Sequence, residues 1–386
     1  MPRPARAHQF IPNEICIVHC VQRCVRRAWL AGVAPLSGRD YSPRREWIRA
    51  RMEALASIFG IDVLTYAILS NHMHVVLRTR PDVVAQWSDQ EVARRWLALF
   101  PGQRSECYLG APTEHEIEVL ARDAEKLAVL RERLSNPSWF MRSLAEPIAR
   151  LANQEDQCTG RFWEGRFKAQ SITDEAGLLA VSMYVDLNPI RAAMAPTPEE
   201  SMHTSAFDRI ESLRGTTMAS SAIAPEVLPT EEAAELRKTL TPDELRARAR
   251  SAKRRRGRSV RRDAWLAPLT IREKSDPLGA QVSSGGVRAS DKGFLSMSLE
   301  DYLALLDWTG RNRPSLGKAV VPGHLEPILK RLGIDGSMWI ELVWRFKKYF
   351  MGSAVGSPQS LSRDAQRHSH RWHRGQRTAR ACFAAE

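Results

Sequence analysis

The sequence predicts an α+β fold: a ferredoxin-like sandwich with an antiparallel sheet and inserted helices, followed by a basic linker and a small helical C-terminal domain. Two observations predict it. Segments with strand and helix patterns follow one another as strand, helix, strand, strand, helices, strand, helix over residues 14–188. Hydrophobic residues make up 43% of the 386 residues, enough to bury a sizeable core.

The first four elements are predicted from local composition. Residues 14–25 read as a strand, and residues 43–58 as a helix with Pro43 at its start and Gly60 just after its end. Residues 61–69 and 73–79 are rich in β-branched and large apolar side chains, with a Ser-Asn turn between them. We therefore expect two adjacent strands after the first helix.

The later elements of the first domain follow the same rules. Residues 82–99 and 113–134 are predicted to be helical, and residues 137–152 form a helix with a break near Pro147. Residues 161–172 lead through a turn into a strand. A helix then covers residues 173–188, with Thr173 as its N-cap, and stops at Pro189.

Composition divides the rest of the chain. We expect a first domain over residues 1–210 and a linker over 211–290 that contains a short helix near 231–250. Residues 291–352 are predicted to form a helical C-terminal domain, and residues 353–386 a disordered basic tail. Within the C-terminal domain, one helical face is predicted to pack in the core through Trp339, Val343, Phe346 and Phe350.

The net charge of +13 is concentrated in one segment. Residues 246–262 hold ten Lys or Arg and no acidic residue, which leaves 13 − 10 = +3 for the remainder. The segment is either an arm that contacts nucleic acid, with Arg254, Arg255 and Arg256 at its centre, or a linker whose charge only aids solubility.

Other sequence features bear on location. No apolar run approaches the length of a membrane span, and the N-terminus lacks the apolar core of a signal peptide. The six cysteines show no spacing typical of a disulfide framework or a zinc site. We expect a reduced cytoplasmic protein that does not contact a membrane.

Two histidines lie at the start of the predicted strand, His74 within residues 73–79 and His72 just before them. Because side chains alternate along a strand, His72, His74 and Val76 share one face, while Asn71, Met73, Val75 and Leu77 share the core face. Two imidazoles side by side can chelate one ion; the alternative is a pair of half-exposed strand histidines. The second pair, His368 and His370, reads as part of the basic tail.

The helix at 173–188 carries Tyr184 and Asn188 four residues apart, and therefore on the same face. A lone helical tyrosine is otherwise explained by core packing. The segment before this helix is cationic and aromatic, with Arg161, Trp163, Arg166 and Lys168. These side chains suit phosphate contacts and base stacking; the alternative is a strand with a charged outer face.

Three segments in this order, "NHMHVVL", "GRFWEGRFKAQ" and "MYVDLNPIRA", resemble those of the tyrosine transposases of small insertion sequences that move as single-stranded DNA, above all their REP-associated relatives. The resemblance covers residues 1 to about 210. It implies an endonuclease with two metal-binding histidines, His72 and His74, a metal ligand at Asn188 and a nucleophile at Tyr184. Mg²⁺ or Mn²⁺ would be the metal.

The resemblance also implies a reaction. Tyr184 would cut single-stranded DNA that carries hairpins, such as REP-like sequences or transposon ends, and form a 5′-phosphotyrosine. A free 3′-hydroxyl could reverse the step, which is strand transfer and the basis of transposition. The protein would act near the nucleoid as a monomer or a homodimer.

Two other functions compete with this one. A hairpin-binding protein derived from a transposase would bind nucleic acid without cutting it. A metal-dependent RNA phosphodiesterase would use two histidines as acid and base, but such enzymes usually carry two copies of a His-x-Thr/Ser pair.

Overall fold

The computed structural model describes residues 11, 13–25, 30–34, 38–100, 111–222, 229–241, 244, 259–272, 279–314, 322–334, 336–350, 352–369 and 371–383. Residues 246–258 of the basic arm, including Arg254, Arg255 and Arg256, lie outside the described residues, and so does His370. Within the described residues, no helix combines the length and apolarity that crossing a membrane requires.

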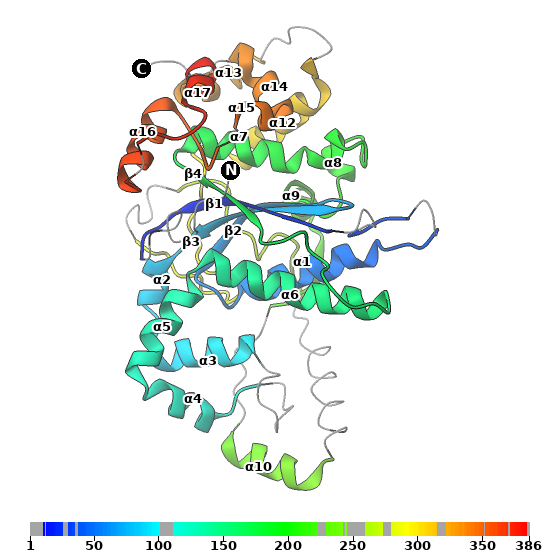
Figure 1. Cartoon of the computed structure of the whole chain (residues 1–386), viewed down its shortest axis with the longest axis vertical. Helices are drawn as coiled ribbons and strands as arrows, with labels where there is room; N and C mark the ends of the chain where they lie inside the picture. The colour runs from blue at the N-terminus through cyan, green and yellow to red at the C-terminus, as the bar shows by residue number, and fades with distance from the viewer. Residues whose placement is uncertain are drawn as a thin grey trace.

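A five-stranded, mostly antiparallel sheet lies at the centre of an α+β arrangement (Figure 1). Its strand order is β2-β3-β1-β4-β7. Strand β7 runs parallel to β4, and the other neighbouring strands are antiparallel. The strands are β1 (Ile17–Arg23), β2 (Ile61–Ile68), β3 (His72–Thr79), β4 (Lys168–Ile172) and β7 (Ala354–Val355). The strands and the hairpin predicted in the first domain are therefore present.

Helices α1 (Pro43–Ala56) and α6 (Pro137–Glu155) cover one face of the sheet (Figure 1). Met73, Val75 and Leu77 of β3 are fully buried in the apolar core beneath them. This is the core face that strand alternation predicts. Both faces of the sheet are covered, because α7 (Glu175–Asp186) lies on the opposite side and contributes to a second core.

Helix α6 continues through Pro147, where the sequence predicts a break. A proline cannot donate a hydrogen bond to the carbonyl four residues earlier, here that of Ser143. In the structure, Arg51 Nε of α1 donates to the Ser143 carbonyl oxygen at 3.1 Å. An arginine from the neighbouring helix thus satisfies the acceptor that Pro147 leaves open.

The helices inserted between β3 and α6 are shorter than predicted, since each predicted helix forms two. Ser88 accepts a hydrogen bond from the Glu91 amide as N-cap of one new helix, and Asp123 from the Lys126 amide as N-cap of another. Both residues are favoured caps because their side chains compete with helical hydrogen bonding. The four helices are α2 (Pro81–Ala85), α3 (Asp89–Leu99), α4 (Glu114–Ala121) and α5 (Ala124–Leu134).

Helix α7 begins one residue later than predicted. Asp174, rather than Thr173, is its N-cap and accepts from the Gly177 amide at 2.8 Å. The Thr173 hydroxyl instead donates to the Val355 carbonyl of β7. A Cβ atom at Gly177 would lie 3.0 Å from that same carbonyl oxygen, so glycine permits the close approach of β7. Helix α8 (Asn188–Arg191) follows directly.

The C-terminal helices pack on the outer side of α7 (Figure 1). The predicted apolar stripe of Trp339, Val343, Phe346 and Phe350 is buried there, as expected. It spans two helices instead of one, because Arg345 has a non-helical backbone between them. The helices are α12 (Leu299–Arg311), α13 (Glu326–Arg331), α14 (Gly336–Trp344) and α15 (Phe346–Tyr349).

The basic tail, predicted to be disordered, is ordered in its described part. It supplies β7 and then α16 (Pro358–Arg367) and α17 (Gln376–Cys382). The Asp174 carboxylate accepts hydrogen bonds from the Ser357 amide and the Ser360 hydroxyl. His373 is buried and pairs with Asp364 at 2.7 Å. These long-range polar contacts stabilise a segment whose composition alone suggests disorder.

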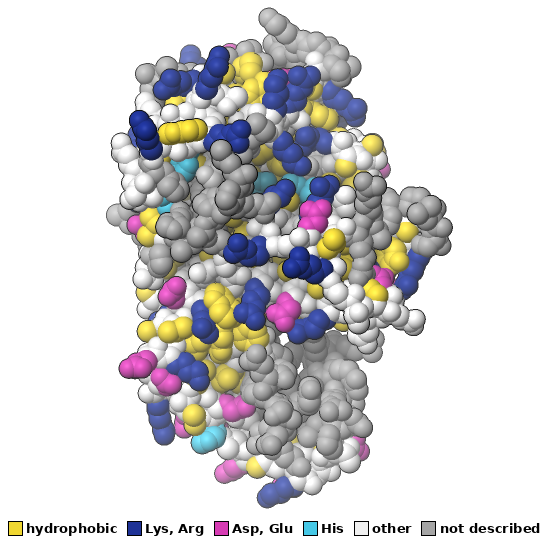
Figure 2. Space-filling view, in the orientation of Figure 1, with side chains coloured by type: hydrophobic (Ala, Val, Ile, Leu, Met, Phe, Trp, Pro, Cys, Tyr) yellow, Lys and Arg dark blue, Asp and Glu magenta, His cyan; other side chains and the backbone are white. Residues whose placement is uncertain are grey.

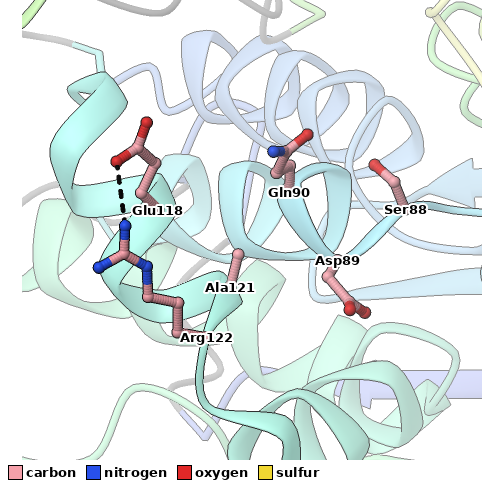
Figure 3. Close-up of a pocket in the computed structure, with 6 residues that line it drawn as sticks. All are labelled: Ser88, Asp89, Gln90, Glu118, Ala121 and Arg122. Atoms are coloured by element: carbon pink, nitrogen blue, oxygen red, sulfur yellow. Dashed lines mark ion pairs between the residues drawn. The ribbon is translucent and has the colours of Figure 1, made fainter.

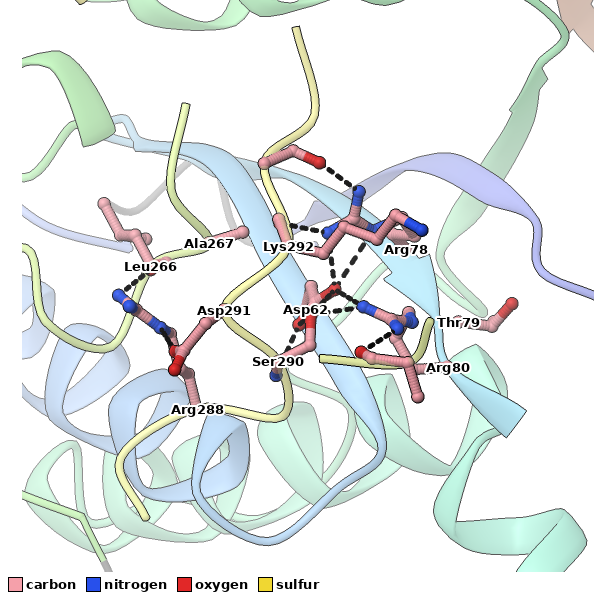
Figure 4. A network of polar contacts seen from close by, with 12 residues as sticks. Asp62, Arg78, Thr79, Arg80, Leu266, Ala267, Arg288, Ser290, Asp291 and Lys292 are labelled. Carbon is pink, nitrogen blue, oxygen red and sulfur yellow. Dashed lines mark hydrogen bonds and ion pairs between the residues drawn. The ribbon is translucent and has the colours of Figure 1, made fainter. Parts of the chain in front are cut away.

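The region predicted to be a linker also packs against the domain in its described part. It follows η3 (Pro198–Glu200) and α9 (Ser205–Leu213), and it contains β5 (Thr217–Ala219), α10 (Thr230–Thr239) and β6 (Ser259–Arg261). Residues 264–272 and 279–292 lie beside β2 and β3, where a polar network around Asp62 holds the second of these stretches (Figure 4). Trp265 and Leu266 are buried in the core under α1.

Candidate active site

Three histidines meet on the sheet face that α7 covers. His72 and His74 come from β3, and Val21 of β1 lies opposite His74. His19, two residues before Val21, therefore lies on the same face of the neighbouring strand. His19 Nε2 and His74 Nδ1 are 2.8 Å apart, and the His72 and His74 ring centroids 4.9 Å. His74 is 0% exposed, so the interpretation of two half-exposed strand histidines does not hold for it.

Tyr184 of α7 reaches the same cluster. Its ring centroid is 5.5 Å from that of His74, in an edge-to-face arrangement, and 6.1 Å from that of His19. The helix packs on β2 and β3, and this packing brings the tyrosine over the histidine strand. The structure thus brings together His72, His74 and Tyr184, which the sequence analysis selected separately.

Two polar atoms in this cluster have no hydrogen-bond partner among the described residues. They are His74 Nε2 and Tyr184 Oη, and both are buried. Other buried atoms of this kind occur elsewhere, for example Trp265 Nε1. What distinguishes His74 and Tyr184 is that their rings are in contact, so the unpaired groups belong to one place. A buried polar atom without a partner costs about 1–3 kcal/mol, which a bound ligand would recover.

The surroundings keep the histidines neutral. Burial lowers the pKa of His19 to about 4. Burial, followed by the charges of Lys347, Arg23 and Lys168, lowers the pKa of His72 to about 4. Burial first, and then the neighbouring histidines, hold the pKa of His74 well below its ordinary value. Neutral imidazoles keep a lone pair, which is the form that binds metal ions.

Asn188 begins α8, directly after the helix that carries Tyr184, and its side chain is hydrogen-bonded to both helices. Its side-chain nitrogen donates to the Tyr184 carbonyl at 2.9 Å, and Arg191 Nη1 lies 3.4 Å from its side-chain oxygen. Arg191 also donates to the Trp344 carbonyl at 2.7 Å and lies over the Tyr184 ring, 4.7 Å from its centroid. The oxygen that would bind a metal is therefore adjacent to a guanidinium in this arrangement.

Two ring nitrogens of the cluster have the lone pairs that a divalent ion would need as ligands. Asn71 Oδ1 lies 2.5 Å from His72 Nδ1 and accepts its hydrogen, which leaves Nε2 of His72 with a lone pair. The unpaired Nε2 of His74 is a second nitrogen donor. No group of three or more His, Cys, Asp or Glu side chains in the described parts of the chain could hold a metal ion. Further ligands would be oxygens, from Asn188 or from a phosphate.

The cationic residues predicted to contact DNA differ in exposure. Arg161, Arg166 and Lys168 are exposed, and Lys168 faces the histidine side of β4 opposite Val21. Trp163 is half-buried, and its indole nitrogen donates to the Ala145 carbonyl of α6 at 2.9 Å. In Figure 2, Lys and Arg side chains gather over the upper half of the face shown, with histidines between them.

Phe346 of α15 closes the cluster on its outer side. Its ring stacks on that of Tyr184, with centroids 4.5 Å apart and planes inclined by 22°. Tyr184 is consequently only 1% exposed. The sequence analysis assigned Phe346 to the core of the C-terminal domain, which is correct, but its contact with Tyr184 depends on tertiary structure.

A shallow pocket between α3 and α4 lies apart from this cluster (Figure 3). It is lined by Ser88, Asp89, Gln90, Glu118, Ala121 and Arg122. Its one ion pair, between Arg122 and Glu118 at 3.7 Å, is largely exposed to solvent. Because none of the predicted site residues lines it, we do not include it in the candidate site.

Comparison with known proteins gives little further guidance. No family model matches the chain, and no curated protein is significantly similar. Among solved structures, the chain is similar to a REP-associated tyrosine transposase bound to a REP hairpin, with 12% sequence identity and a TM-score of 0.32. The match covers 60% of this chain and 97% of the other. At this level of likeness, the function must be argued from the site itself.

Proposed function

We propose that the protein is a metal-dependent endonuclease and strand transferase for single-stranded hairpin DNA, of the tyrosine transposase type. One observation carries the proposal: the unpaired hydroxyl of Tyr184 and the unpaired Nε2 of His74 are both buried, on rings in edge contact with centroids 5.5 Å apart. A nucleophile beside a neutral imidazole cluster is the arrangement that such a reaction needs.

The proposed step is an in-line attack of Tyr184 Oη on a backbone phosphorus. The new bond joins Oη to phosphorus, and the bond from phosphorus to the 3′ oxygen breaks. The phenol loses one proton and the leaving 3′ oxygen gains one, so the step is balanced without an external energy source. The 5′-phosphotyrosine keeps the energy of the broken bond, and a second 3′-hydroxyl can reverse the step.

His72, His74 and Asn188 would hold Mg²⁺ or Mn²⁺. When bound, such an ion polarises the scissile phosphate and offsets charge as the transition state forms. Two imidazoles alone would favour a softer ion, but oxygen ligands favour a hard one.

The charge around the cluster suits a phosphodiester. Arg23, Lys168 and Lys347 all act on the pKa of His72 in the direction expected of nearby cations. A bare divalent cation would be repelled by these groups, whereas a phosphate would be attracted. We therefore expect the metal to bind more tightly when DNA is present.

The proposed reaction requires the site to open. Tyr184 and His74 are 1% and 0% exposed, and Phe346 covers the tyrosine ring. The arrangement described here would be a closed form, in which the α14–α15 segment must move before a strand can reach Oη. Arg161, Arg166 and Lys168 would hold the flanking phosphates.

The finer fold class belongs to this proposal. The elements β1–α1–β2–β3–α6–β4 have the strand order β2-β3-β1-β4, and α1 contacts α6. This order and this pairing of helices support a ferredoxin-like sandwich. The cytoplasm, close to the nucleoid, would be the location, and a monomer or a homodimer the active form.

A covalent-adduct assay tests the proposal. Labelled hairpin DNA with single-stranded flanks is incubated with the full chain and Mn²⁺, and the products are separated under denaturing conditions. We expect an adduct with the natural sequence, none with Tyr184→Phe, and none with His72→Ala or His74→Ala. Tyr349→Phe, which removes the hydroxyl of a different buried tyrosine, is the control and should keep the adduct. An adduct with Tyr184→Phe would refute the assignment of the nucleophile.

Hairpin binding without cleavage is the second candidate. It is favoured by one observation, the burial of Tyr184 beneath Phe346. If the natural sequence binds the hairpin but forms no adduct under any metal condition, this second function is the correct one.

A further inference from the structure

The histidine cluster is connected to the C-terminal segment through Gln170. This residue lies on β4 directly opposite His19 of β1. Its side-chain nitrogen donates to two backbone carbonyls, those of Phe350 at 3.0 Å and Gly352 at 2.9 Å. Its side chain also acts on His19 as a hydrogen-bonding group that raises the pKa of this imidazole, against the larger lowering by burial.

The two carbonyls determine which way the Gln170 amide points. A carbonyl oxygen can only accept, so the atom of Gln170 that faces both of them must be the nitrogen. Its two hydrogens are then both used. The amide oxygen is the atom left for His19, and it too can only accept. His19 must therefore donate to Gln170.

The hydrogen bond from His19 to Gln170 determines which nitrogen of His74 carries the ring hydrogen. His19 Nε2 faces His74 Nδ1 at 2.8 Å, so His19 Nδ1 is the atom that donates to Gln170. A neutral imidazole carries one hydrogen, and in His19 it is on Nδ1. His19 Nε2 then accepts, and the hydrogen between the two rings belongs to His74 Nδ1. The remaining nitrogen of His74, Nε2, keeps its lone pair.

We propose that Gln170 and His19 are positioning residues that hold His74 in the tautomer with hydrogen on Nδ1, so that its Nε2 lone pair is presented to the site beside Tyr184. The use of that lone pair for a metal rests on the function proposed above, whereas the tautomer itself does not. Groups that orient a metal-binding histidine in this way typically affect metal affinity by about 10- to 100-fold.

The test begins with the full-length natural sequence, free of metal and labelled with ¹⁵N in histidine. Long-range proton–nitrogen correlation spectra report which ring nitrogen carries the hydrogen. We expect hydrogen on Nδ1 in both His19 and His74. Hydrogen on Nε2 of His74 would overturn the proposal, whatever the fate of any variant.

Gln170→Leu removes the acceptor for His19 and keeps a side chain of similar size. We expect the His74 spectrum to show a mixture of tautomers and calorimetry to show Mn²⁺ binding weakened by about 10- to 100-fold. Gln22→Leu is the matched control: Gln22 is buried on the other face of β1 and donates to the Gly165 carbonyl at 3.0 Å. It should leave the His74 tautomer and the Mn²⁺ affinity unchanged.

The outcomes separate the two proposals. An unchanged Mn²⁺ affinity and an unchanged His74 tautomer in Gln170→Leu would overturn the positioning role. The expected tautomers without any DNA adduct would support the positioning role and contradict the cleavage function.

Discussion

The two ends of strand β3 carry buried polar clusters that differ in one respect. At the end near Arg78, Asp62 accepts from Arg78 at 2.8 Å and from the Ser290 amide at 3.1 Å. Arg78 donates further to the carbonyls of Gly293 and Lys292 (Figure 4). At the other end, His74 Nε2 and Tyr184 Oη have no partner in the described part of the chain.

The difference distinguishes buried polar groups that stabilise the fold from buried polar groups that could bind a ligand. Charges around Asp62 are opposite and paired, and the contacts of Asp62 and Arg78 hold Ser290 and Lys292 against the sheet. Around His72 the charged neighbours that shift its pKa are all cations. A buried network in which every polar group has a hydrogen-bond partner stabilises one conformation. A network with unpaired groups can still bind a ligand. The same strand thus serves the fold at one end and the proposed site at the other.

The largest expected effect comes from breaking the complete cluster. Asp62→Ala leaves Arg78 and Arg80 buried without their shared carboxylate, and we expect the free energy of unfolding to fall by about 3–5 kcal/mol. The control is Asp307→Ala, which removes an exposed pair with Arg311 and should cost less than about 1 kcal/mol. Urea denaturation measures both. A loss for Asp62→Ala no larger than that of the control would mean that the network does not stabilise the fold.

Lowering the pH should reduce the stability of the protein through the histidine cluster. Below its ordinary pKa of 6.5, His19 takes up a proton in the unfolded chain, but in the folded protein only near pH 4. The unfolded state therefore binds more protons in this window, and stability is lost as the pH falls. The contribution of His19 is up to about 1.4 kcal/mol per pH unit.

Urea denaturation with a chelator, between about pH 7 and 4.5, measures this slope. His19→Phe should reduce the slope, because one titrating group is gone, while His72 and His74, whose pKa values are also lowered, still contribute. An equal slope in the variant would show that His19 is not the source of acid sensitivity.

The smallest expected effect is the change in stability when the hydroxyl of Tyr66 or of Tyr184 is removed. The Tyr66 hydroxyl donates to Asp208 at 2.7 Å, so Tyr66→Phe should cost about 1.5–3 kcal/mol. The Tyr184 hydroxyl has no such partner, so Tyr184→Phe should change stability by less than about 1 kcal/mol or raise it. Thermal unfolding of both variants is the measurement. Equal losses would mean that the Tyr184 hydroxyl is hydrogen-bonded in solution and that the cluster of His74 and Tyr184 is not incomplete.

Local patterns in the sequence predict which residues share a face of a strand or a helix. Alternation along residues 72–77 places the histidines on one face and Met73, Val75 and Leu77 on the core face, and the structure has them so. Four-residue spacing places Asn188 one turn from Tyr184, and their hydrogen bond agrees with it.

The features that the sequence analysis missed depend on contacts between segments that are distant in sequence. His19 was missed because its place beside His74 follows from the register of β1 on β3, although its alternation with Ile17 and Val21 is a signal that could have found it. Residues 279–290 were read as linker because their partner, Asp62, lies more than 200 residues away in sequence. The unbroken helix at Pro147 likewise depends on Arg51 of another helix.

The outer sides of β2 and β4 are both occupied by other segments of the chain. Beside β2, the Ile68 amide donates to the His203 carbonyl at 3.1 Å, and the Val63 carbonyl accepts from Ala267 at 3.0 Å. Beside β4, β7 pairs with Ser171 and Ile172. Exposed strand edges are the usual templates for pairing between molecules and for fibre growth. Where these segments run, a second molecule cannot pair its backbone with β2 or β4.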